Sequence, residues 1–247
     1  MKIKSVLGLT FAFTAMGIIM PAQSQAAAGF SQPTYGYELG AEQQLETAFG
    51  RDVVERTYGR ALATVEWQLY ENPRGDTFDL ELKGGAFAGK YKGSMKVEDE
   101  FGSLTQTRVG VTTEAMGLYT LNAGKADPFL GLSGVVEAVN QNTRAEWQAD
   151  VVTGVKFQVA DDKDLSLMYK KTLAHGMKYY NPERSYRQDD GYLVALIGTK
   201  HMPDATTRSI KLAYEFFDVG DMRQEPNGGV SYEPDTRNIL VSYSRTF

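Results

Sequence analysis

Cysteine is absent from this 247-residue sequence, and histidine occurs only twice. The absence of cysteine excludes a disulfide framework, a thiolate metal site and a lipoprotein anchor, which needs a cysteine at the cleavage point. Phosphate-binding loops, nucleophile elbows and the histidine spacing of metal sites are also missing. The sequence therefore predicts no metal, no cofactor and no catalytic residues.

Long hydrophobic runs are missing as well. Past the N-terminus, no stretch approaches the ~20 consecutive apolar residues that a membrane helix requires, which excludes an α-helical membrane protein. A β-barrel is not excluded, because its strands carry only every second residue into lipid. The formal net charge of −5 argues against nucleic acid as a partner.

The first residues have the features of an export signal. Lys2 and Lys4 precede an apolar stretch over 6–20, and small residues that suit cleavage follow. We predict a signal peptide over 1–26 and a single domain over 27–247. The alternative is a membrane anchor, for which the apolar stretch is short.

Alternation of apolar and polar residues dominates the rest of the chain. It is clearest over 145–159, where Trp147 and Val151 share one face while Glu146 and Asp150 share the other. This period of two is typical of half-buried strands. Residues 192–199 are apolar in both phases, so their orientation stays open. We predict strands at 35–42, 61–69, 78–83, 108–121, 130–138, 145–159, 165–170, 192–199, 210–216 and 239–247.

The last strand, Ile239 to Phe247, carries a family resemblance. It alternates through Tyr243 and finishes on an aromatic residue, and in this it resembles the closing strand of bacterial outer-membrane β-barrels. Arg245 departs from the apolar residue usual at that position in the family. The resemblance implies a small porin-like or OmpA-like protein of the Gram-negative cell envelope. It also implies that Tyr243 and Phe247 form the signal read by the barrel assembly machinery.

The fold expected is all-β: a transmembrane, antiparallel, up-and-down barrel of about ten strands, with eight or twelve as alternatives. Short turns are predicted at 72–76, 122–128, 160–164 and 202–206. Mostly longer connections are predicted at 48–58, 90–103, 139–144, 173–190 and 218–235. Short turns on one side and long loops on the other are typical of outer-membrane barrels. An even strand number places both termini on the short-turn, periplasmic side.

A soluble β-sandwich would show the same alternation. The barrel is favoured because the strands are long, because aromatic residues gather toward strand ends as in interfacial girdles, and because an export signal is present. We therefore expect a monomer in the outer membrane, in contact with its lipid and lipopolysaccharide.

In such a barrel the polar face points into the lumen. Unpaired burial of these charges would cost several kcal/mol per ion, so they must pair or be hydrated. One interpretation is an ion-pair network that fills a structural barrel, and the other is a narrow, acid-lined channel that favours cations. The charged residues predicted to line the lumen are Glu38, Glu66, Asp79, Glu81, Lys83, Arg108, Glu114, Glu137, Glu146, Asp150, Lys156, Lys170, Lys211 and Glu215.

An enzyme is the alternative from another functional class. Some outer-membrane barrels modify lipid A or cleave proteins, mostly with a histidine near the outer rim. His175 falls in the predicted outer loop 173–190, where a base–nucleophile pair is conceivable. A solvated loop histidine is the competing interpretation. The same loop offers contacts to an outside partner or to lipopolysaccharide phosphates, because interfaces favour arginine and tyrosine. The contact candidates are His175, Tyr179, Tyr180, Arg184, Tyr186 and Arg187.

Overall fold

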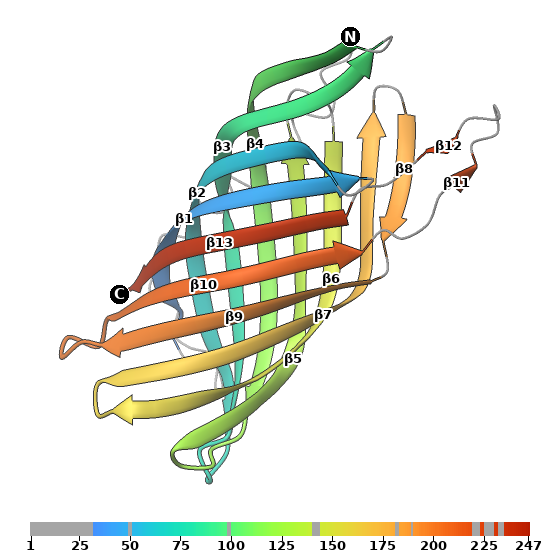
Figure 1. The fold of residues 1–247 in the computed structure, drawn as a ribbon. Coiled ribbons are helices and arrows are strands. Elements are labelled where there is room, and N and C mark those ends of the chain that lie inside the picture. Colours follow the sequence, from blue (N-terminus) through green and yellow to red (C-terminus); the bar gives the residue numbers. More distant parts are fainter. Residues whose placement is uncertain are drawn as a thin grey trace.

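The computed structural model describes 32–247 except for short gaps at 49–50, 98–99, 140–143, 181–182, 189, 219–222, 225–229 and 232–234. Within these ranges, ten long strands form one closed antiparallel β-barrel (Figure 1). The expected fold class and the strand number of ten are confirmed. No helix in the described part is long and apolar enough to cross a membrane. The predicted signal peptide lies outside the described residues.

The barrel has up-and-down topology, since each strand pairs with the barrel strands before and after it along the chain. The last strand pairs with the first and closes the ring. The barrel strands are β1 (Thr34–Ala48), β2 (Arg51–Glu71), β3 (Thr77–Val97), β4 (Glu100–Thr120), β5 (Ala126–Val139), β6 (Arg144–Ala160), β7 (Lys163–Tyr180), β9 (Asp190–His201), β10 (Thr207–Asp218) and β13 (Asp235–Thr246). In the described part of the chain, three short strands lie outside this ring: β8 (Glu183–Gln188), which pairs with the end of β7, and β11 (Arg223–Gln224), which pairs with β12 (Val230–Ser231).

Short connections lie at one end of the barrel, which we call the turn end, and the opposite end is the hairpin end. The strand pairs β2–β3, β4–β5, β6–β7 and β9–β10 are joined at the turn end by two to five residues. Both ends of the described chain lie there too, because Tyr35 and Phe247 exchange backbone hydrogen bonds of 3.4 and 2.8 Å. This arrangement is the predicted one.

Three predicted loops at the hairpin end are wrong. Residues 90–103 belong to a hairpin in which β3 and β4 stay paired as far as Val97 and Glu100. Most of 48–58 belongs to β2, and most of 173–190 belongs to β7 and β8. At this end the strands continue past the region in which one face is apolar. The backbones stay paired there, but apolar and polar residues no longer alternate. Because the strands were predicted from that alternation, these paired segments were predicted as loops.

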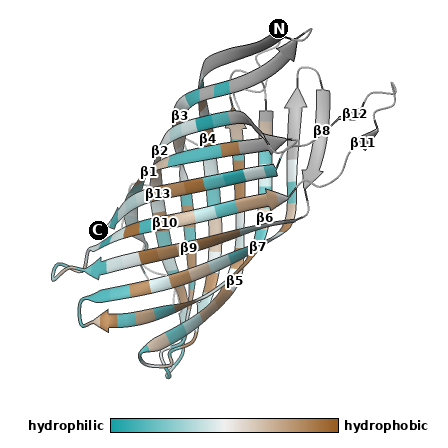
Figure 2. Cartoon of the chain, in the orientation of Figure 1, coloured by the Kyte–Doolittle hydropathy of each residue, from teal (hydrophilic) through white to brown (hydrophobic). Residues whose placement is uncertain are grey.

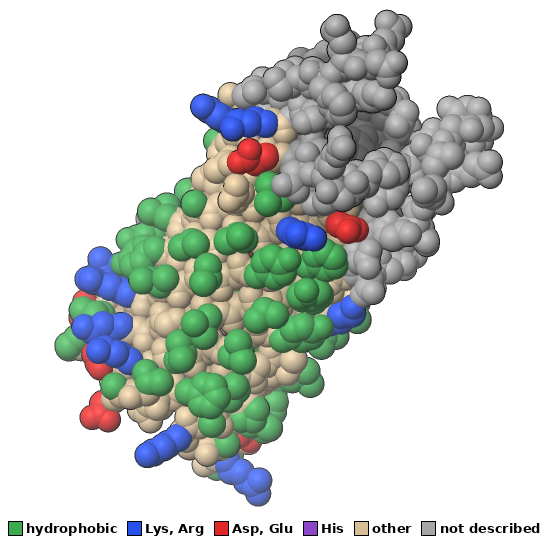
Figure 3. All heavy atoms as spheres, viewed as in Figure 1, with side chains coloured by type: hydrophobic (Ala, Val, Ile, Leu, Met, Phe, Trp, Pro, Cys, Tyr) green, Lys and Arg blue, Asp and Glu red, His purple; other side chains and the backbone are tan. Residues whose placement is uncertain are grey.

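The outward face of the barrel is apolar along its middle. Figure 2 shows hydrophobic residues on the strands and hydrophilic ones at the turns, and Figure 3 shows apolar side chains spread over the wall with charged ones toward its ends. The alternation predicted from sequence therefore separates an apolar outside from a polar inside. Large apolar side chains exposed on the described outer face include Leu39, Leu130, Leu132, Val136, Leu167, Leu196, Ile210, Leu212, Ile239 and Val241.

The structure also fixes the orientation of β9, which the sequence left open. Tyr192, Val194 and Leu196 are exposed on the outer face, whereas Leu193 and Ala195 are buried inside. Both phases are apolar because this part of the wall meets an apolar part of the lumen.

A hydrogen-bonded tie joins two neighbouring turns at the turn end. Asp76 accepts the backbone N–H of Asn122 at 2.8 Å through Oδ1 and the Asn72 side-chain amide at 2.7 Å through Oδ2. Gly75 adopts a φ of +85° beside it, a conformation that glycine tolerates best. The tie holds the β2–β3 turn against the β4–β5 turn, and these hydrogen bonds lower the pKa of Asp76 below its usual range.

We expect Asp76→Asn to lower the stability of the barrel at neutral pH and to reduce its sensitivity to acid. Because the folded-state pKa of Asp76 is lowered, its contribution is present above the unfolded value of about 4 and is lost as the pH falls through the folded value. The measurement is urea unfolding at a series of pH values from neutral to strongly acidic. Asp161→Asn, at an exposed turn carboxylate, is the control for loss of charge. Equal acid sensitivity of Asp76→Asn and wild type would contradict the expectation.

Candidate functional site

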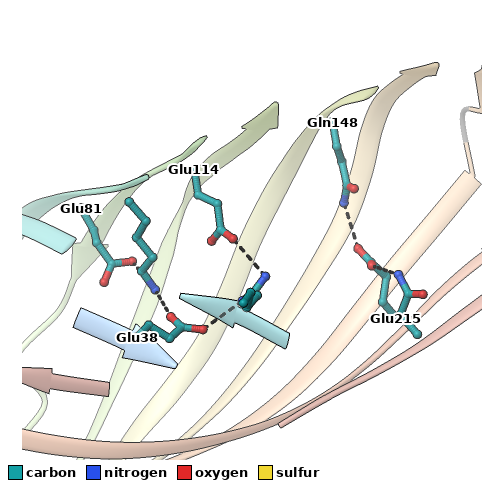
Figure 4. A network of polar contacts seen from close by, with 8 residues as sticks. Glu38, Glu81, Glu114, Gln148 and Glu215 are labelled. Atoms are coloured by element: carbon teal, nitrogen blue, oxygen red, sulfur yellow. Dashed lines mark hydrogen bonds and ion pairs between the residues drawn. The ribbon is translucent and has the colours of Figure 1, made fainter. Parts of the chain in front are cut away.

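An ion-pair cluster lies inside the barrel on β1 to β4 (Figure 4). Arg60 donates from Nη2 to Glu38 at 2.9 Å and from Nη1 to Glu114 at 3.2 Å. Lys83 Nζ lies 2.9 Å from Glu38 and 3.1 Å from Glu81. The Glu38 side chain is 2% exposed, so two cations replace the water that would otherwise solvate its charge.

Strand register brings these residues together. Lys83 on β3 is the register partner of Glu114 on β4, and Glu38 on β1 is the partner of Leu62, two residues from Arg60 on β2. Since residues two apart on a strand share a face, all of these side chains point into the lumen. The cluster therefore crosses four adjacent strands at one level of the barrel.

A second polar cluster is built around Glu215 on β10. Asn238 on β13 donates its side-chain amide to Glu215 at 2.8 Å, and the Gln148 amide on β6 lies 3.2 Å from the other carboxylate oxygen. Gln148 also donates to Asp150 at 2.8 Å. Ser133 and Asp150 belong to the same group, joined by a hydrogen bond of 3.1 Å. Figure 4 shows Gln148 and Glu215 pointing toward one another.

His175 lies inside the barrel, and its predicted position in an outer loop is wrong. Its side chain is buried, its Nε2 is 2.8 Å from Glu146 Oε1, and its ring stacks on Phe217 at a centroid distance of 4.8 Å. The cause is a β-bulge: Ala149 pairs with Ala174 and Asp150 with Thr172, which leaves Leu173 without a register partner. The extra residue reverses the phase of β7 and turns His175 inward.

The opposite part of the lumen is apolar. A buried cluster spans β5, β6, β7, β9, β10 and β13, and partly buried hydrophobic residues extend it. The lumen therefore has a wall of ion pairs on β1 to β4 and a wall on β5 to β13 that combines hydrocarbon with the second polar cluster. The cluster consists of Phe129, Val152, Met168, Leu193, Ala195, Ala213 and Leu240, with Met116, Leu118 and Ile197 packed against it.

Two hollows in the lumen are lined by these walls. The hairpin-end chamber has a cavity volume of about 110 Å³, and the turn-end chamber has a cavity volume of about 150 Å³. Both are lined by Glu114, Val135, Lys170 and Lys211, which therefore lie between them. Of the described residues around the hairpin-end chamber, six are acidic and three are basic, whereas acids and bases balance around the other. The acids of the hairpin-end chamber are Glu42, Glu114, Glu137, Glu146, Asp150 and Glu215, and its bases are Arg60, Lys170 and Lys211.

Most of the charged residues predicted to face the lumen line one of these chambers. The exceptions are Glu66, Asp79, Arg108 and Lys156. Arg108 is 5% exposed. The other three lie toward the turn end: Glu66 and Asp79 pair in register with Glu81 and Gln68, and Lys156 pairs with Asp127. The residues that line a chamber are Glu38, Glu81, Lys83, Glu114, Glu137, Glu146, Asp150, Lys170, Lys211 and Glu215.

Sequence reasoning missed three important lumen residues. Arg60 lies one position before the predicted strand 61–69, although it shares the phase of Thr64 and Glu66. Arg56 is 4% exposed and donates to Gln44 at 2.7 Å, but it fell within a predicted loop. Asn238 precedes the predicted last strand by one residue. Arg60 and Asn238 keep the phase of the strand that follows them, whereas Arg56 lies where no alternation marks the strand.

The remaining contact candidates lie at the hairpin end, in the segment formed by β7 and β8 rather than in a loop. Their side chains lie outside the described part of the structure. They are Tyr179, Tyr180, Arg184, Tyr186 and Arg187. No group of three or more acidic or histidine side chains among the described residues is placed to hold a metal ion.

Comparison with known proteins yields structural likeness only. No family model matches the chain, and no curated protein matches it in sequence. An outer membrane channel from Pseudomonas putida F1 is 11% identical, with a TM-score of 0.45, over 93% of this chain and 100% of that one. The transport unit of the autotransporter AIDA-I from Escherichia coli is 10% identical, with a TM-score of 0.45, over 98% and 97%. The outer membrane protease OmpT from Escherichia coli is 9% identical, with a TM-score of 0.31, over 92% and 99%. Scores and identities at this level transfer no role to this chain.

Proposed function

We propose that the protein is a monomeric barrel of the bacterial outer membrane, exported by its N-terminal segment. The exposed apolar middle of the wall supports this, because Leu132 and Ile210 are 61% and 62% exposed and would face hydrocarbon in a membrane. A closed barrel also satisfies its backbone hydrogen bonds internally, as lipid requires. Its partners are then membrane lipid, lipopolysaccharide and the assembly machinery, with Tyr243 and Phe247 on the strand that this machinery reads.

Within that setting, the protein acts as a narrow channel that prefers cations. The observation that carries this proposal is the pair of lumen chambers separated by a layer that includes Lys170 and Lys211. The acid excess of the hairpin-end chamber attracts cations, because a low-dielectric wall focuses the field of its charges. The layer between the chambers narrows the path and keeps conductance small.

We expect the purified protein in a planar bilayer to show small, discrete conductance steps. Under a KCl gradient, we expect the reversal potential to have the sign that a channel preferring K⁺ over Cl⁻ produces. The double variant Glu42→Gln, Glu215→Gln should move the reversal potential toward zero, since both residues line the acidic chamber. Glu81→Gln, in the balanced chamber, is the matched control and should change it less.

The alternative is a structural barrel whose lumen is filled by ion pairs. The Arg60–Glu38–Lys83 contacts favour it, because they occupy the lumen with paired side chains. Zero conductance from protein that shows heat-modifiable gel mobility would establish this alternative and refute the channel. The lipid-modifying enzyme loses the residue on which it rested, because His175 is buried beside Glu146.

A further inference from the structure

The hairpin-end chamber has features that ion passage does not require. We propose that it binds a small amphipathic organic cation, an alkyl- or arylammonium ion, with the ammonium group at Glu215 and Asn238. This inference rests on the proposed function only in taking the lumen as accessible to solutes. Three properties of the chamber point to this ligand: an unused acceptor, an excess of acids and an apolar wall.

The unused acceptor is the side-chain oxygen of Asn238. Asn238 lines the chamber and is 8% exposed, and its Oδ1 has no hydrogen-bond partner among the residues that the structure describes. The orientation of the amide is set by its nitrogen, which donates to Glu215 at 2.8 Å. A buried acceptor without a partner is costly. A ligand that carries N–H donors would satisfy it, whereas an anion would not.

The charges that line the chamber select the same kind of ligand. Glu42, Glu137 and Glu146 line the chamber together with Glu215. The cations that face it are Arg60, which is bound to Glu38 and Glu114, and the two lysines shared with the other chamber. His175 adds a titratable group, and it is engaged by Glu146 at 2.8 Å. The carboxylates that line the chamber thus favour a positively charged donor.

The apolar wall determines which uncharged group the ligand carries. Phe87, Val139, Leu193, Phe217 and Leu240 are buried and line the chamber. Aromatic faces attract cations and aliphatic side chains accept hydrocarbon. An inorganic cation would leave this wall without a contact, whereas a short alkyl or aryl group would cover it.

The test is isothermal titration calorimetry of the full chain in detergent micelles with benzylammonium chloride. Saturable binding at one site is expected, and benzyl alcohol, which has the same body without the charge, should bind at least about tenfold more weakly. Empty micelles control for partition into detergent. Glu215→Gln should weaken benzylammonium binding by about tenfold or more, and Glu81→Gln, in the other chamber, should leave it unchanged.

Heat-modifiable mobility identifies variants that fold, and Glu42→Gln replaces Glu215→Gln if the latter does not. Equal binding of benzyl alcohol and benzylammonium would overturn the proposal, since it would show apolar partition alone. Unchanged benzylammonium binding in whichever of these two variants folds would overturn the proposal as well. Cation-preferring conductance without benzylammonium binding would refute the proposed binding site but would still support the channel. Binding without conductance would support the site in a barrel that does not conduct.

Discussion

Arg60→Met is expected to destabilise the barrel by about 3 kcal/mol, the lower end of the cost of removing one partner from a buried ion pair. Methionine keeps an unbranched side chain but has no guanidinium, so Glu114 loses its 3.2 Å contact to Arg60, while Glu38 keeps Lys83. Loss of the guanidinium also removes a bulky cation from the lumen, so conductance should rise severalfold and cation preference should strengthen. Urea unfolding in lipid vesicles measures the first effect, and planar-bilayer recording measures the second.

Two variants separate the geometry of this contact from its charge. Arg60→Lys keeps the positive charge but lacks the planar fork that reaches two carboxylates at once, so an intermediate loss of stability is expected. Glu81→Gln removes a partly exposed acid, and its partner Lys83 keeps the contact to Glu38. This variant should therefore lower the stability of the barrel much less than Arg60→Met does. Wild-type stability and conductance in Arg60→Met would contradict the view that this cluster both holds the lumen together and restricts it.

Alternation along the chain predicted the strands. Together with strand length, the aromatic residues near strand ends, the export signal and the short and long connections, it was sufficient to predict a barrel of about ten strands. Every barrel strand has one face toward the apolar exterior, and that constraint imposes a period of two wherever it applies. It stops applying at the hairpin end, where β3 and β4 remain paired to Val97 and Glu100. A predicted strand therefore finishes where the apolar face finishes, although the paired backbone continues. For the same reason Arg60 and Arg56 fell outside the predicted strands.

The site was harder to predict than the fold. Phase alone indicates that Glu38 and Lys83 face the lumen, but their pairing depends on which strands are neighbours and on register. His175 illustrates a second limit, since a single unpaired Leu173 reverses the phase of β7 and no sequence pattern marks that bulge. The apolar lumen wall made β9 ambiguous, because Leu193 and Val194 are both apolar while facing opposite sides.

On the outer face, Leu132→Arg is expected to cost about 2–4 kcal/mol, the penalty for arginine at the bilayer midplane on a barrel's lipid face. Leu132 lies in the middle of β5, pairs in register with Gly117 and Val151, and is 61% exposed. The measurement is reversible urea unfolding of protein inserted in phospholipid vesicles. A smaller yield of folded, heat-modifiable protein in the same vesicles is expected to accompany the loss of stability.

A second outward-facing position, closer to the end of the barrel, provides the control. Val159 is 59% exposed but lies near the turn end of β6, so Val159→Arg should cost only about 0–1 kcal/mol, as near a membrane interface. The two positions are almost equally exposed and receive the same substitution, so a difference between them reports the surrounding medium. If the outer face met water, arginine would be tolerated at both, since surface substitutions are usually within about 0.5 kcal/mol. Equal, small effects at Leu132 and Val159 would therefore refute the membrane location, whereas a large effect confined to Leu132 would establish hydrocarbon around the middle of the barrel.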